Sequence, residues 1–440
     1  MGITIDASIQ ARMREDWNQR AREDASYYVA FGRRGQEGEE FFATAEEIAN
    51  SFEMELKRMP KNVNRRTWRA LEIGCGPGRL MRPLSRNFGE IHGVDVSDEM
   101  VRLARENLRG IPHAHVHSTD GASLAGFADE SFDIVYSYAV FQHIPSRDVI
   151  LRYLQEAHRV LKIGGLLRAQ FNGLPQGVDH QYNTWSGVRL AASELMEFAR
   201  QRDFQVLALE GAGTQYMWTS WRKRPQGWHS RLRAETKEAD VRVRRITNAH
   251  SSEPVAPNGG RFASISIWIE DLPGECGLHD LEIAIGGTPG VITYIGPLDN
   301  SGIQQLNVIL PRLERTGLLP VKILWFGIPV LATPATLRVI PAGPKVPRLL
   351  DVSDGVNLLS GRKIETRTVK ITFEEVSHPD EFRIILAANP VAGVEIFCTN
   401  PLSQRFEVNF RVPESVASGN HELLVYLGKR RFGPVPIEVA

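Results

Sequence analysis

Between Trp68 and Lys223 the sequence alternates short, apolar, β-rich runs with stretches of helical periodicity. Such alternation predicts βαβ units, and hence a mostly parallel sheet with helices on both faces. Helices are expected over Asp98–Leu108, where Asp98 can cap the first turn, and over Ser146–Leu161. The expected strands are Arg69–Gly74, Glu90–Asp95, Ala114–Ser118, Phe132–Ser137, Gly165–Phe171 and Phe204–Leu209.

The two flanks of this region have different patterns. Residues 1–60 carry two amphipathic stripes, which predict two helices that cap the next domain. Past residue 240 helical periodicity disappears, and short Val, Ile, Leu and Phe runs are separated by Gly, Pro and Asn. There Asn307–Pro311 recurs as Asn409–Pro413, and Gly317 recurs as Gly419, both 102 residues apart (413 − 311 and 419 − 317). We therefore expect two tandem all-β modules of about a hundred residues each.

These changes of pattern give the expected domain boundaries. A helical cap (1–60) precedes an α/β domain (61–225), a linker (226–240), the first β module (241–341) and the second β module (345–440). Basic residues cluster around the linker, but acidic residues are interspersed, which favours a solvated linker over a phosphate-binding patch. A chain of 440 residues is also too long for one ordinary core.

Composition and charge disfavour several classes of protein. Lys+Arg and Asp+Glu both number 52, so no overall charge favours nucleic acid or an anionic membrane. No apolar run reaches the roughly 20 residues that span a bilayer, and the first residues lack the pattern of a signal peptide. Cys75, Cys276 and Cys398 are far apart and odd in number, so a disulfide framework is not expected. We expect a cytoplasmic protein with no membrane span and no nucleic-acid partner.

The strongest chemical signal is Ala70–Leu80, where an apolar strand runs into Gly74, Gly76 and Gly78. Glycines let the backbone turn tightly and approach a ligand, and the N–H groups of the following helix point at that ligand. A nucleotide-like ligand is therefore expected at the carboxyl end of this strand, although a purely structural turn is the alternative. Arg79 stands where the dinucleotide fingerprint needs a glycine, which disfavours a nicotinamide oxidoreductase.

Polar residues also end the next strands. Asp95 ends the second strand, where a carboxylate can accept hydrogen bonds from both ribose hydroxyls of an adenosine; a loop or helix-capping aspartate is the alternative. Asp120, in Thr119-Asp120-Gly121, can bond the adenine amino group, but Asp-Gly is also a common turn pair. The fourth strand ends in polar and aromatic groups that lead to His143.

Together these motifs resemble the class I S-adenosylmethionine-dependent methyltransferases. Glu72-x-Gly74-x-Gly76-x-Gly78 is similar to the first motif of that family, Asp95 to its ribose-binding acid and Asp120 to its adenine-contacting position. The resemblance covers residues from about 60 to 225. It implies a Rossmann-like sheet of seven strands, the last antiparallel and contributed by Thr214–Arg222, with S-adenosyl-L-methionine as the cofactor. The cofactor-binding residues that it implies are Glu72, Gly74, Cys75, Gly76, Gly78, Asp95, Val96, Met100, Asp120, Gly121, Ser137 and Tyr138.

The family resemblance also suggests where the methyl acceptor binds. His143 is the candidate general base, because it follows the fourth strand and imidazole titrates near neutrality; the alternative is a histidine that packs or orients the loop. Ser137–Val140 stands in place of the Asp/Asn-Pro-Pro-Tyr signature, which argues against base-flipping adenine methylation. The expected acceptor is an O or N atom of a glycan, a metabolite or a protein side chain. Candidates to line its pocket, with packing as the alternative for each, are Tyr27, Tyr28, Trp185, Arg189, Tyr216 and Trp218.

The histidines of His113-Ala-His-Val-His117 carry a weaker signal. Alternate histidines share one face of a strand and can bind a metal. The strand is expected at the edge of the sheet, away from the cofactor, where exposed polar residues also prevent aggregation. We therefore expect no metal site.

The first β module resembles the immunoglobulin-like domains found at the ends of bacterial surface proteins, on the evidence of Ile283–Gly296 and Gln305–Pro311. The second module matches less well, because Ala387-Ala388 replaces Gly286-Gly287. Such β-sandwiches bind glycans or other polymers, form homodimers or contact a macromolecular substrate, and a fold alone does not decide among these roles. A non-catalytic scaffold that keeps the cofactor fold and acts through its β-sandwiches is the alternative to an enzyme.

Overall fold

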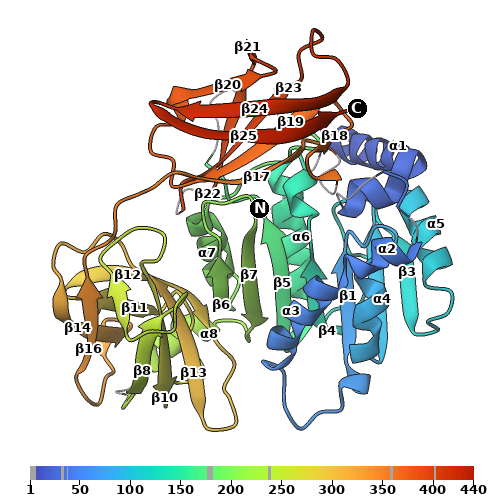
Figure 1. Ribbon diagram of the computed structural model, residues 1–440. Coiled ribbons are helices and arrows are strands. Elements are labelled where there is room, and N and C mark those ends of the chain that lie inside the picture. Colours follow the sequence, from blue (N-terminus) through green and yellow to red (C-terminus); the bar gives the residue numbers. More distant parts are fainter. Residues whose placement is uncertain are drawn as a thin grey trace. The chain divides into compact units, whose positions relative to one another are not determined.

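The computed structural model describes residues 6–30, 34–36, 38–175, 182–235, 239–356, 360–400 and 403–440 (Figure 1). The chain divides into two compact units. The first unit comprises residues 1–19 and 44–343, and the second comprises residues 20–43 and 344–440. None of the described helices is long and apolar enough to cross a membrane.

The α/β domain of the first unit is built on a Rossmann-like sheet. Its strands lie in the order β3-β2-β1-β4-β5-β7-β6. β7 is antiparallel to both of its neighbours, and the other pairs up to β5 are parallel. The predicted parallel sheet with an antiparallel last strand is therefore confirmed. The strands are β1 (Arg69–Ile73), β2 (Glu90–Asp95), β3 (Ala114–Ser118), β4 (Phe132–Ser137), β5 (Leu161–Phe171), β6 (Phe204–Glu210) and β7 (Met217–Lys223).

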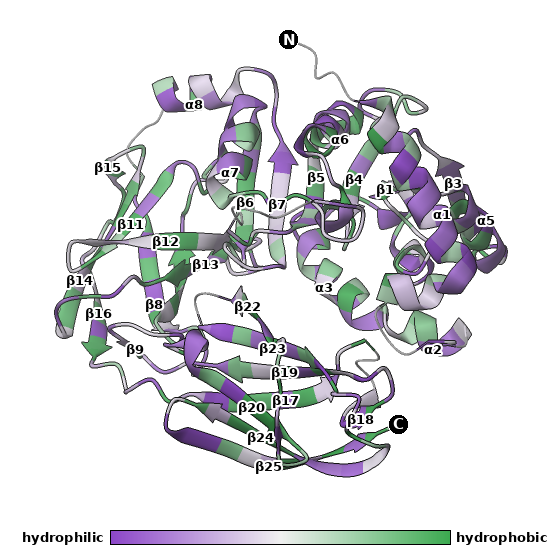
Figure 2. Cartoon of the chain, turned by 90° about the horizontal axis from the view of Figure 1, so that it is seen from above, coloured by the Kyte–Doolittle hydropathy of each residue, from purple (hydrophilic) through white to green (hydrophobic). Residues whose placement is uncertain are grey.

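Helices cover both faces of this sheet, because each buried strand carries apolar side chains on both sides. One cluster packs Ala70 and Ile134 of the sheet against α3, α4 and α5, and the other packs Val135 and Leu167 against α6 and α7. In Figure 2 β5 is mostly hydrophobic, whereas α5 and α7 carry both hydrophilic and hydrophobic residues. The helices are α3 (Glu46–Leu56), η1 (Arg65–Thr67), α4 (Met81–Leu84), η2 (Ser85–Asn87), α5 (Asp98–Asn107), η3 (Phe141–His143), α6 (Arg147–Val160), α7 (Ala192–Gln201) and α8 (Trp228–Glu235).

Several details differ from the sequence-based prediction: β5 begins at Leu161 and not at Gly165, and the last strand of the sheet is Met217–Lys223 and not Thr214–Arg222. Ser97, and not Asp98, caps α5: the Ser97 hydroxyl accepts a hydrogen bond from the Met100 N–H at 3.1 Å. The predicted cap forms three helices in the described residues rather than two, namely α1 (Ala7–Ala30), α2 (Gly38–Ala43) and α3. The second apolar stripe is divided because the chain turns at residues 44–45.

The first β module consists of two sheets that share β12. One sheet has the order β8-β10-β13-β12, and the other has the order β12-β11-β14-β16-β9 with β15 paired to β14. The stretch predicted as a linker contains α8, whose Trp228 is buried. The strands are β8 (Arg242–Asn248), β9 (Val255–Pro257), β10 (Ser264–Glu270), β11 (Leu281–Ile285), β12 (Thr288–Ile295), β13 (Ile303–Ile309), β14 (Gly317–Trp325), β15 (Ile328–Pro329) and β16 (Ala335–Ile340).

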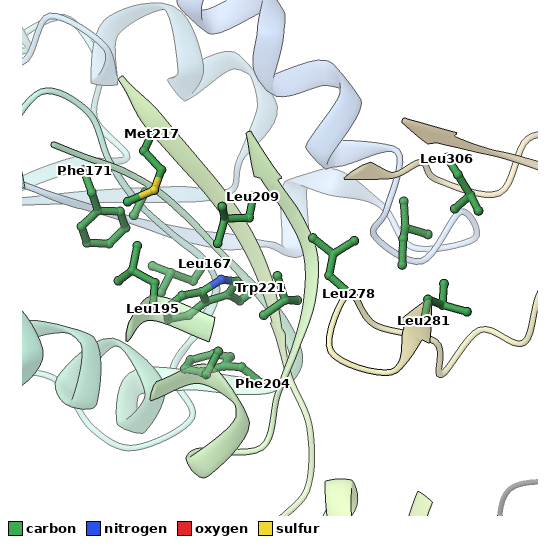
Figure 3. Packing of buried hydrophobic residues seen from close by; sticks show 14 of the residues in the cluster. Leu167, Phe171, Leu195, Phe204, Leu209, Met217, Trp221, Leu278, Leu281 and Leu306 are labelled. Carbon is green, nitrogen blue, oxygen red and sulfur yellow. The ribbon is translucent and has the colours of Figure 1, made fainter. Parts of the chain in front are cut away.

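The first β module is hydrogen-bonded to the edge of the α/β sheet. Tyr294 of β12 pairs with Ala208 of β6, and the Leu278 N–H donates to the Val206 carbonyl at 2.8 Å. β1 to β16 therefore form one network of 16 strands. Figure 3 shows a continuous apolar core from Trp221 and its neighbours to Leu278 and beyond. This contact covers the edge of β6, which would otherwise expose unpaired backbone groups.

The second unit contains α2, the part of α1 from Arg20 onward, and the second β module. A four-stranded sheet, β17-β19-β23-β22, and a five-stranded sheet, β18-β25-β24-β20-β21, enclose one apolar core. β23 begins 102 residues after β13 (405 − 303), and β24 begins 102 residues after β14 (419 − 317), as the sequence repeat predicts. The elements are β17 (Arg348–Asp354), β18 (Lys363–Ile364), β19 (Thr368–Glu374), η5 (Pro379–Glu381), β20 (Phe382–Leu386), β21 (Asn389–Pro390), β22 (Glu395–Asn400), β23 (Arg405–Arg411), β24 (Gly419–Leu427) and β25 (Arg430–Val439).

The replacement of Gly286-Gly287 by Ala387-Ala388 leads to a prediction about stability. Ala387 and Ala388 have φ values of 50° and 65°, in the left-handed region that Gly286 and Gly287 also occupy. This region costs a residue with a Cβ about 1 kcal/mol. We expect Ala388→Gly to raise the free energy of unfolding of the second unit by roughly that amount, measured by chemical denaturation. The reverse change at the matched position, Gly287→Ala, should destabilise the first unit; an unchanged or lower stability of the Ala388→Gly protein would contradict the argument.

Candidate active site

The glycine bend follows β1 at the carboxyl edge of the sheet. Gly74, Gly76 and Gly78 have φ values of 73°, 52° and 84°, which L side chains rarely adopt. A Cβ on Gly74 would lie 2.4 Å from a methyl carbon of Val140. Even a Cβ would therefore require Val140 to move, and the backbone itself forms the surface of the bend.

Asp95 ends β2, and its carboxylate is held by the bend. The Gly76 N–H donates to Oδ2 at 2.8 Å, and the Ser97 N–H donates to Oδ1 at 2.9 Å. Among the described residues, no cation forms an ion pair with this carboxylate. Burial raises the pKa of Asp95 to about 6, although its backbone hydrogen bonds oppose the shift. The carboxylate keeps acceptor capacity beyond its bonds to backbone N–H groups, so the residues present fit a ligand with hydroxyl donors, such as a ribose.

Four more of the predicted cofactor-binding residues follow β2 and β3, and one of them, Asp120, is predicted to contact the adenine. Oδ1 of Asp120 accepts hydrogen bonds from the Ala122 and Ser123 N–H groups at 2.9 and 2.7 Å. This oxygen therefore forms the turn, which was the alternative reading of Asp120, and the adenine contact stays a prediction. A Cβ on Gly121 would lie 2.9 Å from Val96, so these two predicted residues are in close contact. Met100 is fully buried below them.

The first half of α1 lies on the loop after β3. Gln10 donates to the Asp120 carbonyl at 3.0 Å, and Arg14 donates to the Thr119 carbonyl at 2.8 Å. Between them Met13 is buried. The amphipathic stripe predicted a cap here, but no sequence signal identified these two polar contacts.

Three more of the predicted cofactor-binding residues, Glu72, Ser137 and Cys75, are hydrogen-bonded to other protein groups or buried near the bend. The Tyr136 hydroxyl donates to Glu72 at 3.0 Å, and burial raises the pKa of Glu72 to about 8. The Ser137 hydroxyl donates to the Ile73 carbonyl at 2.9 Å and joins β4 to β1. Cys75 is buried, and burial raises the pKa of its thiol.

Alternating aromatic rings and guanidinium groups line the face of the sheet beside the bend. The rings of Tyr138 and Trp218 stack with their centroids 5.4 Å apart. The Arg79 guanidinium lies 5.5 Å from the Tyr138 ring centroid, and the Arg168 guanidinium lies 4.5 Å from that of Trp218. The sequence predicts both aromatic residues as site candidates but neither arginine, because the contacts of the two guanidinium groups depend on segments that are distant in the sequence.

His143 is buried at the end of η3, and both of its ring nitrogens have partners. Nδ1 lies 2.7 Å from the Trp185 carbonyl, which accepts, so this nitrogen carries the proton. Nε2 lies 3.1 Å from the amide nitrogen of Gln142, which donates to it. The arrangement orients the histidine, and the general-base prediction requires Gln142 to release Nε2.

The other acceptor-pocket candidates differ in their surroundings. The Trp185 ring lies 5.4 Å from that of His143 and is 38% exposed. Arg189 donates to the Pro175 carbonyl at 2.6 Å. Tyr216 is 52% exposed. An acceptor role for each residue stays a prediction.

Tyr27 and Tyr28 belong to the second unit. Tyr27 is buried, with the Arg34 guanidinium 4.4 Å from its ring centroid. The Tyr28 hydroxyl donates to Glu23 at 2.9 Å. These contacts lie within that unit, and the acceptor-pocket role of both tyrosines stays a prediction.

The histidines near the sheet edge stack on one another. β3 is the edge strand, and its His117 lies 3.3 Å from His92 of β2, nitrogen to nitrogen. Burial lowers the pKa of His92 to about 4, so it is neutral at neutral pH. In the described ranges no group of three or more His, Cys, Asp or Glu residues could hold a metal ion.

Known proteins are similar to the α/β domain. Residues 71–169 match the sequence profile of the family described as "Methyltransferase domain". Trans-aconitate 2-methyltransferase of Rhodopseudomonas palustris (strain BisB18) is 35% identical over 114 residues, which are 25% of this chain and 40% of that protein. The ubiquinone biosynthesis O-methyltransferase of Ruegeria pomeroyi is 35% identical over 100 residues, 22% of this chain and 38% of that protein. This chain spans less than half the length of each of these curated relatives.

A solved SAM-dependent methyltransferase from Methanosarcina mazei is 21% identical, with a TM-score of 0.30, over 37% of this chain and 94% of that one. At this TM-score no conclusion follows from the similarity. The profile match is to a methyltransferase domain and is confined to residues 71–169, and the cofactor of the site is S-adenosylmethionine.

The raised pKa of Asp95 leads to a prediction about cofactor binding. Ribose hydroxyls need the ionised carboxylate as acceptor, so affinity for S-adenosylhomocysteine should be constant above about pH 7 and fall as the pH drops through about 6. Without the shift, the loss would come near the ordinary value of 3.8. Calorimetric titration from pH 5 to 8 measures this, with Asp95→Asn as a control that should bind weakly at every pH. An affinity that stays flat down to pH 5 would refute the assignment.

Proposed function

We propose that this chain is an S-adenosylmethionine-dependent methyltransferase that acts on an O or N atom of a glycan, a metabolite or a protein side chain. The observation that carries the proposal is the buried Asp95 carboxylate, which is bonded to the Gly76 backbone of the bend and has no cation as partner among the described residues. The profile match of residues 71–169 supports the same activity.

The residues around the bend supply positioning rather than reactive groups. When bound, the cofactor supplies an electrophilic methyl group on a sulfonium, which leaves as a neutral thioether. Such a reaction needs orientation of the two reactants and exclusion of water. The buried Met13 of α1 and the stacked rings of Tyr138 and Trp218 serve these two needs. His143 assists only acceptors that arrive protonated, and only once Gln142 releases it.

We further propose that the two β modules are immunoglobulin-like sandwiches. The two-sheet arrangement around an apolar core in each module supports this assignment. The second module serves to bind a glycan or protein, or to form a homodimer, and the whole chain acts in the cytoplasm. The first module has an additional structural role, because it covers the edge of β6.

The alternative function is a non-catalytic scaffold that binds cofactor and acts through its β modules. The occupied nitrogens of His143 favour it, since an enzyme that needs a base would keep one available. Both the enzyme and the scaffold would use the Asp95 carboxylate to bind the cofactor. Cofactor binding alone therefore does not distinguish the two functions.

Calorimetry with S-adenosylhomocysteine and with NAD tests the cofactor site. We expect micromolar affinity for S-adenosylhomocysteine and none for NAD, and Asp95→Ala should abolish binding because the ribose loses its acceptor. Glu106→Ala is the control: Glu106 is an exposed carboxylate of α5 that pairs with Arg102, and its loss should leave affinity unchanged. Tight binding of NAD, or full affinity in the Asp95→Ala protein, would reject the proposal.

A screen with methyl-labelled cofactor separates the enzyme from the scaffold. Glycan, amine and protein fractions are incubated with the full chain, and label is expected in one of them. Asp95→Ala should remove that label. A protein that binds S-adenosylhomocysteine but labels no fraction would favour the scaffold.

A further inference from the structure

Arg79, directly after the glycine bend, is a buried cation whose charge is not matched. Its exposed fraction is 5%. One terminal nitrogen donates to the Thr44 hydroxyl at 3.1 Å and to the Thr44 carbonyl at 3.4 Å. Nε is buried and has no hydrogen-bond partner within the described residues, where no carboxylate forms an ion pair with Arg79 either.

The neighbours of Arg79 do not neutralise it. Tyr138 and, after it, Glu72 are the groups that act on the guanidinium most directly, and with a pKa of about 8 Glu72 is mostly uncharged at neutral pH. Tyr138 offers its hydroxyl and its π face but no carboxylate. By contrast, Arg168 lies 3.8 Å from Glu55. A buried charge without a counter-ion is costly, so the position of Arg79 calls for an anion that the described residues do not supply.

Arg79 and Asp95 adjoin the same bend. Gly76 donates its N–H to Asp95, and Arg79 comes three residues later, next to Gly78. A molecule whose ribose is bonded to Asp95 and whose chain crosses the bend therefore brings its other end toward Arg79. In S-adenosylmethionine that end carries an amino acid, whose carboxylate matches the planar fork of a guanidinium.

We propose that Arg79 binds the carboxylate of the amino-acid end of the methyl donor, with Thr44 as the positioning residue that orients the guanidinium. The inference rests on the proposed function, since it takes S-adenosylmethionine as the ligand. Arg79 thus favours methyl donors that carry an amino-acid carboxylate over nucleosides that lack one.

Binding of S-adenosylmethionine and of decarboxylated S-adenosylmethionine, measured by calorimetry without acceptor, tests the proposal. The two ligands differ only by the carboxylate. The wild-type chain should prefer the first by about 10- to 100-fold, the range of a charge-assisted pair. Arg79→Met keeps most of the side-chain volume and should bind both ligands about equally. Arg86→Met, at an exposed arginine paired with Glu46, should keep the wild-type preference.

The outcomes separate this inference from the proposed function. Equal affinities in the wild type, or an unchanged preference in Arg79→Met, would overturn the role of Arg79 while cofactor binding stands. Failure of the wild type to bind S-adenosylmethionine would contradict the proposed function itself. Thermal unfolding provides a further readout: loss of an unmatched buried charge should leave the melting temperature of Arg79→Met unchanged or higher. A large drop, with both ligands weakened equally, would show a structural role instead.

Discussion

The hydrogen bond from the Gly76 N–H to Asp95 is the contact on which the rest of the site depends. This bond joins the glycine bend after β1 to the end of β2. It therefore fixes the position of the bend relative to the carboxylate that would accept hydrogen bonds from a sugar. The strands below hold the bend in place, because Ser137 of β4 donates to the Ile73 carbonyl at the end of β1. Burial of Asp95 makes this contact sensitive to pH, since the carboxyl group accepts hydrogen bonds on both oxygens without also donating one only when it is ionised.

The site is supported by structure well outside the α/β domain. α1 supplies polar contacts to the loop after β3 through Gln10 and Arg14. The first β module closes the opposite edge of the sheet through Tyr294 and Leu278. An exposed β6 would leave the last strands of the sheet free to pair with other chains. The module is therefore part of the framework that carries the site and shares its hydrophobic core.

Much of the fold could be predicted from local patterns, and much of the site could not. β2, β3 and β4 have the predicted bounds because alternating apolar runs and turn residues define them locally. The cap of α5 was assigned to Asp98 and not to Ser97, since both residue types suit the position and only geometry decides. The cofactor motif is contiguous, so sequence reasoning found Asp95 and the glycines. From the sequence, Arg79 is only the residue that replaces the third glycine of the dinucleotide fingerprint. Its burial, its lack of an ion pair among the described residues and its contact with Thr44 depend on segments that are distant in the sequence.

The most direct test of the central claim is a crystal structure of the chain with S-adenosylhomocysteine. We expect both ribose hydroxyls to lie within hydrogen-bonding distance of the Asp95 carboxylate, and Gly76 to keep its bond to the same side chain. A nucleoside bound elsewhere, or an Asp95 whose oxygens contact only Gly76 and Ser97 in the complex, would contradict that claim.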